Sequence, residues 1–150
     1  MFGIVEVGSL GDYSFVIIVT KNHRGEYLYS KKTENDTWEF QGGHIEKQET
    51  PYEAAIRELK EEAGITSSSI IPIADCFTDE KDTHDEINSM CTKVRNGMVF
   101  LVEIKDNPIV YNLCMEMDEV KWFESLPEKL TYPELTKCLY KMTKIQKEES

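Results

Sequence analysis

The stretch from Gly42 to Ile65 reads GGHIEKQETPYEAAIRELKEEAGI. It predicts a loop that runs into one helix, because Thr50 and Glu53 form a capping-box pattern around Pro51, a residue suited to the first helical position. Gly64 follows the last helical turn and predicts a C-terminal cap. A helix with both ends marked in this way fixes which of its residues share a face.

This predicted helix has an apolar face with an acidic arc beside it. At about 100° per residue, the apolar face consists of Tyr52, Ala55, Ile56, Leu59 and Ala63. The adjacent arc holds three glutamates, namely Glu58, Glu61 and Glu62. Carboxylates at spacings of three and four residues repel one another, so either solvent tolerates them or a cation lies among them. Their position beside the buried face favours a wall of acids along a cleft.

The charged residues of this stretch stand at set intervals. Gly43 is followed after five residues by Glu49, and after seven more by Arg57-Glu58-Leu59-x-Glu61-Glu62-x-Gly64-Ile65. This pattern resembles the Nudix box, the signature of the Nudix hydrolase family. Two flanking segments also resemble the family, WEFQGG at residues 38–43 and EVKWFESLPE at residues 119–128.

The resemblance implies an α/β fold of the Nudix type, an α/β/α sandwich with a mixed β-sheet between helices, in one domain over residues 1–150. It implies a divalent cation, magnesium (Mg²⁺) with Mn²⁺ as an alternative, because hard cations take oxygen ligands. The implied ligands are the carboxylates of Glu58, Glu61 and Glu62 and the carbonyl of Gly43. Arg57 is implied to pair with Glu49 and so to orient the ligands. The implied catalytic residues are Glu58, Arg57 and Glu49.

Two features of the chemistry stay open at this point. The proton of the attacking water goes either to Glu58 or to an acid in the segment Asp79 to Glu86, which offers Glu80, Asp82, Asp85 and Glu86. Gln41 stands where the family commonly has proline, and it joins His44 as a candidate substrate-binding residue. The glycines at 42 and 43 are expected to let the backbone turn sharply and approach a phosphate closely.

The rest of the chain predicts further strands and one more helix. The expected strands cover residues 13–21, 26–30, 37–40, 69–80, 97–105 and 118–126, and an amphipathic helix covers residues 132–147. A turn at Arg24-Gly25 joins the first two strands into a hairpin. Pro72 predicts an edge position or a bulge in its strand.

Composition limits the classes of partner. The length of 150 residues suits one domain. The net charge of −11 argues against binding to duplex nucleic acid. The cysteines at 76, 91, 114 and 138 form no Cys-x-x-Cys pair, so no disulfide framework is expected. No apolar run approaches the roughly 20 residues that span a bilayer, and MFGIVEVGSL lacks a basic leader. We therefore expect a cytoplasmic protein with no membrane partner, either a monomer or a homodimer.

The resemblance implies metal-dependent hydrolysis of a phosphoanhydride in a nucleoside diphosphate derivative. We favour a nucleoside triphosphate pyrophosphohydrolase, including one that clears oxidised nucleotides such as 8-oxo-dGTP. One alternative is a pyrophosphatase of ADP-ribose, another dinucleotide or a nucleotide sugar, and a second is a non-catalytic Nudix module that senses nucleotides. An RNA 5′-end pyrophosphohydrolase needs a basic path for the strand, and the negative net charge argues against it.

Overall fold

The computed structural model describes residues 2–32, 34, 36–66, 69–79, 94–105 and 117–149. Within this part of the chain the elements are β1 (Phe2–Val5), β2 (Tyr13–Asn22), β3 (Tyr27–Lys32), β4 (Thr37–Glu39), β5 (Gln41–His44), α1 (Pro51–Ala63), β6 (Ile70–Thr78), β7 (Arg95–Ile104), β8 (Met117–Phe123) and α2 (Pro133–Glu149). The six strands and two helices expected from the sequence are all present, with bounds shifted by a few residues.

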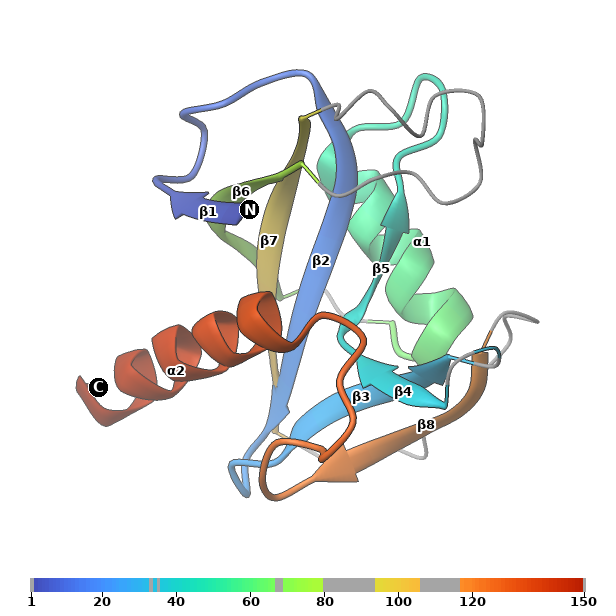
Figure 1. Cartoon of the computed structure of the whole chain (residues 1–150), viewed down its shortest axis with the longest axis vertical. Helices are drawn as coiled ribbons and strands as arrows, with labels where there is room; N and C mark the ends of the chain where they lie inside the picture. Colours follow the sequence, from blue (N-terminus) through green and yellow to red (C-terminus); the bar gives the residue numbers. More distant parts are fainter. Residues whose placement is uncertain are drawn as a thin grey trace.

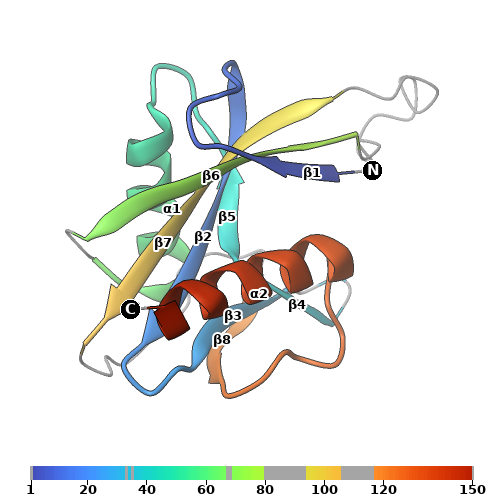
Figure 2. The same cartoon turned by 90° about the vertical axis from the view of Figure 1, so that its left-hand side faces the viewer.

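The strands form one mixed sheet. Its order is β1-β6-β7-β2-β3-β4, with β5 paired to β2 and β8 paired to β3. The β2–β7 pair is parallel, and the other described pairs are antiparallel. Helices α1 and α2 lie on opposite faces of the sheet in two perpendicular views (Figures 1 and 2). The predicted α/β/α sandwich with a mixed sheet is therefore confirmed.

Each helix packs on its own hydrophobic cluster. Leu59 of α1 lies in a cluster with Ile18 of β2, whereas Leu139 of α2 lies in a second cluster with Val19 of β2. Because successive side chains of a strand point to opposite faces, neighbouring residues of β2 enter different clusters. Both faces of the sheet are thus covered by a helix, and α1 packs against β5.

The ends of α1 are fixed as the sequence predicts. The Thr50 side chain accepts a hydrogen bond from the Glu53 amide at 3.1 Å, and the Thr50 amide donates to the Glu53 carboxylate at 3.0 Å. Gly64 adopts φ 69°, and its amide donates to the Lys60 carbonyl at 2.9 Å. These caps satisfy backbone groups that a helix end otherwise leaves without partners, and they set the rotation of α1.

Two expectations about local structure were wrong. Gly42 and Gly43 form no turn: they lie within β5, opposite Ile17 and Val16 of β2. Tyr52, expected on the apolar face of α1, is 43% exposed. Its place in the buried face is taken by Ala54, which is fully buried.

The irregularity predicted at Pro72 is present. The β6–β7 register shifts between Pro72 and Ala74, which is the predicted bulge. Cys76 and Cys138 are free thiols, while the other two cysteines lie outside the described residues. None of the helices in the described ranges is long and apolar enough to cross a bilayer.

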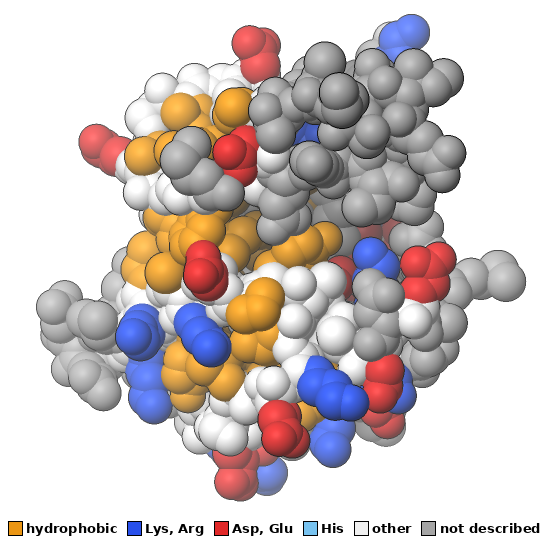
Figure 3. All heavy atoms as spheres, viewed as in Figure 1, with side chains coloured by type: hydrophobic (Ala, Val, Ile, Leu, Met, Phe, Trp, Pro, Cys, Tyr) orange, Lys and Arg blue, Asp and Glu red, His pale blue; other side chains and the backbone are white. Residues whose placement is uncertain are grey.

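On the face seen in Figure 3, hydrophobic side chains gather between β1 and α2.

Candidate active site

The acidic arc of α1 faces β5. Glu58 and Glu62 are buried, with 9% and 2% of their surface exposed. Glu61 lies at the rim, where 47% of its side chain is exposed. The arc therefore borders the buried face of the helix, as its position in the sequence predicts. Burying carboxylates costs free energy unless hydrogen bonds or cations compensate, so their contacts decide what the site can do.

Both buried carboxylates lie against the double glycine of β5. Glu62 accepts a hydrogen bond from the Gly42 amide at 2.7 Å. At Gly43, an added Cβ would lie 2.4 Å from Oε1 of Glu58 and 2.7 Å from its Cδ. The absent side chain at position 43 thus provides the space that the Glu58 carboxylate occupies.

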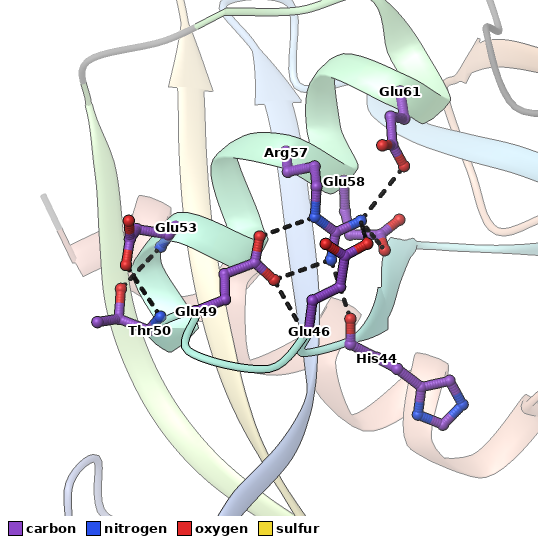
Figure 4. Close-up of polar contacts among 8 residues, drawn as sticks. All are labelled: His44, Glu46, Glu49, Thr50, Glu53, Arg57, Glu58 and Glu61. Carbon is purple, nitrogen blue, oxygen red and sulfur yellow. Dashed lines mark hydrogen bonds and ion pairs between the residues drawn. The ribbon is translucent and has the colours of Figure 1, made fainter.

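Arg57 is the centre of an ion-pair network (Figure 4). Its Nε and Nη2 donate to the two carboxylate oxygens of Glu49 at 2.8 and 3.0 Å. Its Nη1 donates to Glu58 at 2.9 Å and to Glu61 at 3.3 Å. Further contacts reach Glu46 at 3.6 Å and the carbonyl of His44 at 3.0 Å. The expected pair between Arg57 and Glu49 is present, and the same guanidinium also holds two acids of the arc.

Burial and the guanidinium set the charges of these groups. Burial raises the pKa of Glu58 to about 7, although the neighbouring Arg57 opposes this shift. Hydrogen bonds from Arg57 lower the pKa of Glu49. The bond to Glu49 raises the pKa of Arg57, so the guanidinium stays charged. The Glu58 carboxyl can therefore gain or lose a proton near neutral pH.

The strand register favours a different carbonyl from the one predicted at Gly43. The Ile45 amide donates to the Ser14 carbonyl at 3.0 Å, and Val16 lies opposite Gly43 in the same ladder. Because antiparallel partners alternate between bonded and non-bonded pairs, the carbonyl of Gly43 points towards β2. The Gly42 amide, by contrast, points towards α1, where it bonds to Glu62. The carbonyl on the side of the acids is accordingly that of Gly42.

The family model described as NUDIX domain matches residues 12–140. The chain belongs to the NUDIX domain family.

Curated relatives of this Nudix chain match part of its length. An RNA pyrophosphohydrolase of Marinomonas sp. is 44% identical over 48 residues, which cover 32% of this chain and 30% of that protein. An RNA pyrophosphohydrolase of Hahella chejuensis is 39% identical over 57 residues, covering 38% and 35%. The chain thus matches only about a third of the length of these relatives.

Solved structures share the whole fold. A Bacillus subtilis pyrophosphohydrolase, BsRppH, has a TM-score of 0.75 at 22% identity over 99% of this chain and 91% of that one. The NUDIX domain of Shewanella oneidensis NrtR, complexed with ADP ribose, has a TM-score of 0.68 at 14% identity over 90% and 89%. At these identities the likeness establishes the Nudix fold.

The donor set of this Nudix domain suits a hard divalent cation. Within the described residues, no three acid, histidine or cysteine side chains already converge as a metal cage. The acids instead contact Arg57 and the Gly42 amide. All of their donors are oxygens on one helix arc, and the space at Gly43 admits the Glu58 carboxylate. Mg²⁺ or Mn²⁺ would thus be held by the carboxylates of Glu58, Glu61 and Glu62.

The two candidate substrate-binding residues have different surroundings. Gln41 is fully buried, and its amide bonds to Thr20, to Ser30 and to the Leu28 carbonyl. The amide therefore braces the interior of the sheet and does not line the site. The imidazole of His44 points away from Arg57 (Figure 4), and His44 is among the residues that line a cavity of about 540 Å³. Position 44 consequently connects the acidic site, through its carbonyl, with a hollow beside it.

The cavity brings together residues that the sequence does not single out. Its lining consists of Asp12, Ser14, His44, Val94, Arg95 and Asn96. These residues come from three separate segments and form no motif. Of the segment expected to offer a general base, Asp79 follows β6, and the four acids named there lie outside the described residues.

Proposed function

We propose that this protein hydrolyses a phosphoanhydride bond of a nucleoside 5′-triphosphate in a metal-dependent reaction that releases pyrophosphate. One observation carries the proposal: Glu58 and Glu62 are buried against the double glycine of β5, while Arg57 holds Glu58 and Glu61 from the side. Buried carboxylates destabilise a fold unless they are compensated. Their concentration on one arc is explained by a cation that binds there.

The residues divide the work of this reaction. A bound divalent cation offsets phosphate charge and activates water. Glu58, Glu61 and Glu62 hold that cation. Arg57, fixed by both oxygens of Glu49, keeps the carboxylates of Glu58 and Glu61 in place, and the Gly42 amide does so for Glu62. With a pKa raised to about 7, Glu58 is also suited to accept a proton at neutral pH.

The choice of a small nucleotide rests on charge. The net charge is −11, and on the face in Figure 3 the Lys and Arg side chains of the described residues are interspersed with Asp and Glu. A long RNA strand is bound through a continuous basic path. A 5′-triphosphorylated RNA end is nevertheless the second candidate, because the curated relatives are RNA pyrophosphohydrolases. The phosphate chemistry at the acids is the same for both.

Other classes have weaker support. The structurally similar NrtR domain is complexed with ADP ribose. This likeness supports pyrophosphatase activity on a dinucleotide or a nucleotide sugar as an alternative function for this protein. A non-catalytic sensor does not need the acids, whereas this chain retains Glu58, Glu61 and Glu62. The complete set of acids therefore supports catalysis.

The test is a product-resolved screen with magnesium. Its substrates are ribo- and deoxyribonucleoside triphosphates, 8-oxo-dGTP, ADP-ribose, a diadenosine polyphosphate and a short RNA with a 5′-triphosphate. We expect the highest kcat/KM for a nucleoside triphosphate, with pyrophosphate as product and no turnover in chelator. A higher kcat/KM for the RNA would establish the second candidate, and turnover of ADP-ribose alone would contradict the proposal.

A further inference from the structure

The cavity beside the acidic site is placed to receive the part of a nucleotide that follows its phosphates. His44 lines the cavity, and its carbonyl accepts a hydrogen bond from Arg57 at 3.0 Å. The volume of about 540 Å³ falls in the range of small-molecule sites. A nucleotide whose phosphates lie at the acids can therefore extend past His44 into this hollow.

One wall of the cavity is held rigidly. Asn96 donates through Nδ2 to the Gly11 carbonyl at 2.7 Å, and Ser14 donates to the Asn96 carbonyl at 3.3 Å. The fully buried Asp75 accepts from the Leu10 amide at 3.0 Å and from the Tyr13 hydroxyl at 2.6 Å. Residues on both sides of Asp12 are thus fixed to the sheet.

The backbone of Asp12 is held in an uncommon conformation. Its φ is 46°, in the left-handed region that only glycine, asparagine and aspartate visit readily. Such a conformation persists where the surroundings enforce it, and it is found at binding sites more often than elsewhere. Here the enforced backbone places Asp12 in the cavity lining.

The lining combines hydrogen-bond acceptors with donors. Arg95 brings a guanidinium, and Asp12 brings a carboxylate. Asn96 commits one Nδ2 hydrogen, and Ser14 its hydroxyl proton, to backbone carbonyls. The Asn96 amide oxygen, the Ser14 lone pairs and the Asp12 carboxylate can therefore accept hydrogen bonds from a ligand that offers hydroxyl donors. In nucleotides the hydroxyl donors belong to ribose, and a carboxylate is a common partner of the 2′-hydroxyl.

We propose that this cavity binds the ribose of the substrate and that Asp12 accepts a hydrogen bond from its 2′-hydroxyl. The inference rests on the proposed function, and it makes the enzyme selective for ribonucleotides over deoxyribonucleotides. Since the 2′-hydroxyl is what distinguishes RNA from DNA units, the selectivity applies to free nucleotides and to an RNA 5′ end alike.

The test compares Asp12→Asn with a matched control. Asp36→Asn changes another aspartate with positive φ (55°), one that pairs with Lys31 and does not line the cavity. Asparagine tolerates the same backbone conformation, so both variants should fold. For each protein, kcat/KM is measured with ATP against dATP and with GTP against dGTP. Binding of ADP against 2′-deoxy-ADP, and of GDP against 2′-deoxy-GDP, is measured in magnesium.

The expected result is a ribose preference of about 10- to 100-fold in the unmodified protein, as for a hydrogen bond to a charged group. Asp12→Asn should reduce it to a few-fold, while Asp36→Asn retains it. Equal kcat/KM for ribo- and deoxyribonucleotides, or a preference untouched by Asp12→Asn, would overturn the inference and leave the proposed function standing. If no nucleotide is hydrolysed, the proposed function fails, and the binding comparison alone decides the ribose site by the same two outcomes.

Discussion

Replacing Gly43 with alanine should disable the site without unfolding the protein. The new Cβ would lie 2.4 Å from Oε1 of Glu58, whereas ordinary contact begins near 3.4 Å, so the carboxylate must move by about 1 Å. A misplacement of that size can cost about 100-fold in rate. The colliding atoms end a flexible side chain, and Gly43 is in an ordinary strand conformation. We therefore expect a thermal midpoint within a few degrees of the unmodified protein.

The assay is a Mn²⁺ titration together with kcat/KM on the best substrate of the screen. Gly3→Ala is the matched control, because its Cβ would meet the Phe77 ring at 2.3 Å in β1, where no acid of the cluster contacts it. We expect Gly43→Ala to weaken Mn²⁺ binding and to lower kcat/KM about 100-fold, and Gly3→Ala to change neither. Metal affinity and rate within threefold of the unmodified protein for Gly43→Ala would refute the assignment of this space to Glu58.

Three further outcomes are expected. Magnesium should raise the thermal midpoint and chelator should reverse this, because a ligand of the native state stabilises it by mass action. Glu61→Gln should reduce the shift. An unchanged midpoint at millimolar magnesium would count against the site. Arg57→Ala should lose about 10- to 100-fold in metal affinity or activity and regain part of its rate at higher magnesium. A raised KM for the nucleotide that does not respond to magnesium would instead show that Arg57 binds the substrate. Burial raises the pKa of Glu58 to about 7, so below pH 7 a metal must displace the proton of the Glu58 carboxyl. Apparent magnesium affinity should therefore fall about tenfold from pH 8 to pH 6. Without metal, the folded state keeps this proton while the unfolded chain releases it near pH 4.5, so Glu58 should lower stability as pH rises from about 4.5 to 7. Glu58→Gln should abolish both pH effects, and their persistence would contradict the assignment.

The helix at the centre of the site could be predicted because its signals are local. The capping box at Thr50, the cap at Gly64 and the acidic arc all lie within one stretch, and the structure places each as expected. The Arg57–Glu49 contact was implied by the resemblance to the Nudix box, and it is present in the structure.

The strands β1 and β5 could not be predicted in the same way. β5 contains two glycines, which have low strand propensity, and it exists because it pairs with β2, more than twenty residues earlier. β1 has four residues and pairs with β6, about seventy residues later. The same pairing information bears on the predicted carbonyl ligand at Gly43, because the direction of a strand carbonyl depends on the register of its partner.

The cavity shows the same limit at the level of the site. Asp12, His44 and Asn96 are distant in sequence, and only the β2–β5 and β2–β7 pairings bring them together. Its one local feature in the sequence is the Gly11-Asp12 pair, and both residues have positive φ in the structure. A glycine followed by aspartate is common in ordinary loops, so the signal cannot be interpreted without the fold.

The central claim is that the acids of α1 hold the cation that makes this protein a hydrolase. Its most direct test is the rate of pyrophosphate release from the best nucleoside triphosphate, at saturating magnesium, for the unmodified protein and for Glu62→Gln. The substitution keeps the shape of the side chain and removes the charge, and a folded variant with an unchanged circular dichroism spectrum is the precondition. We predict that turnover is nearly abolished, because catalysis depends on the bound ion. A rate within a few-fold of the unmodified protein would contradict the account.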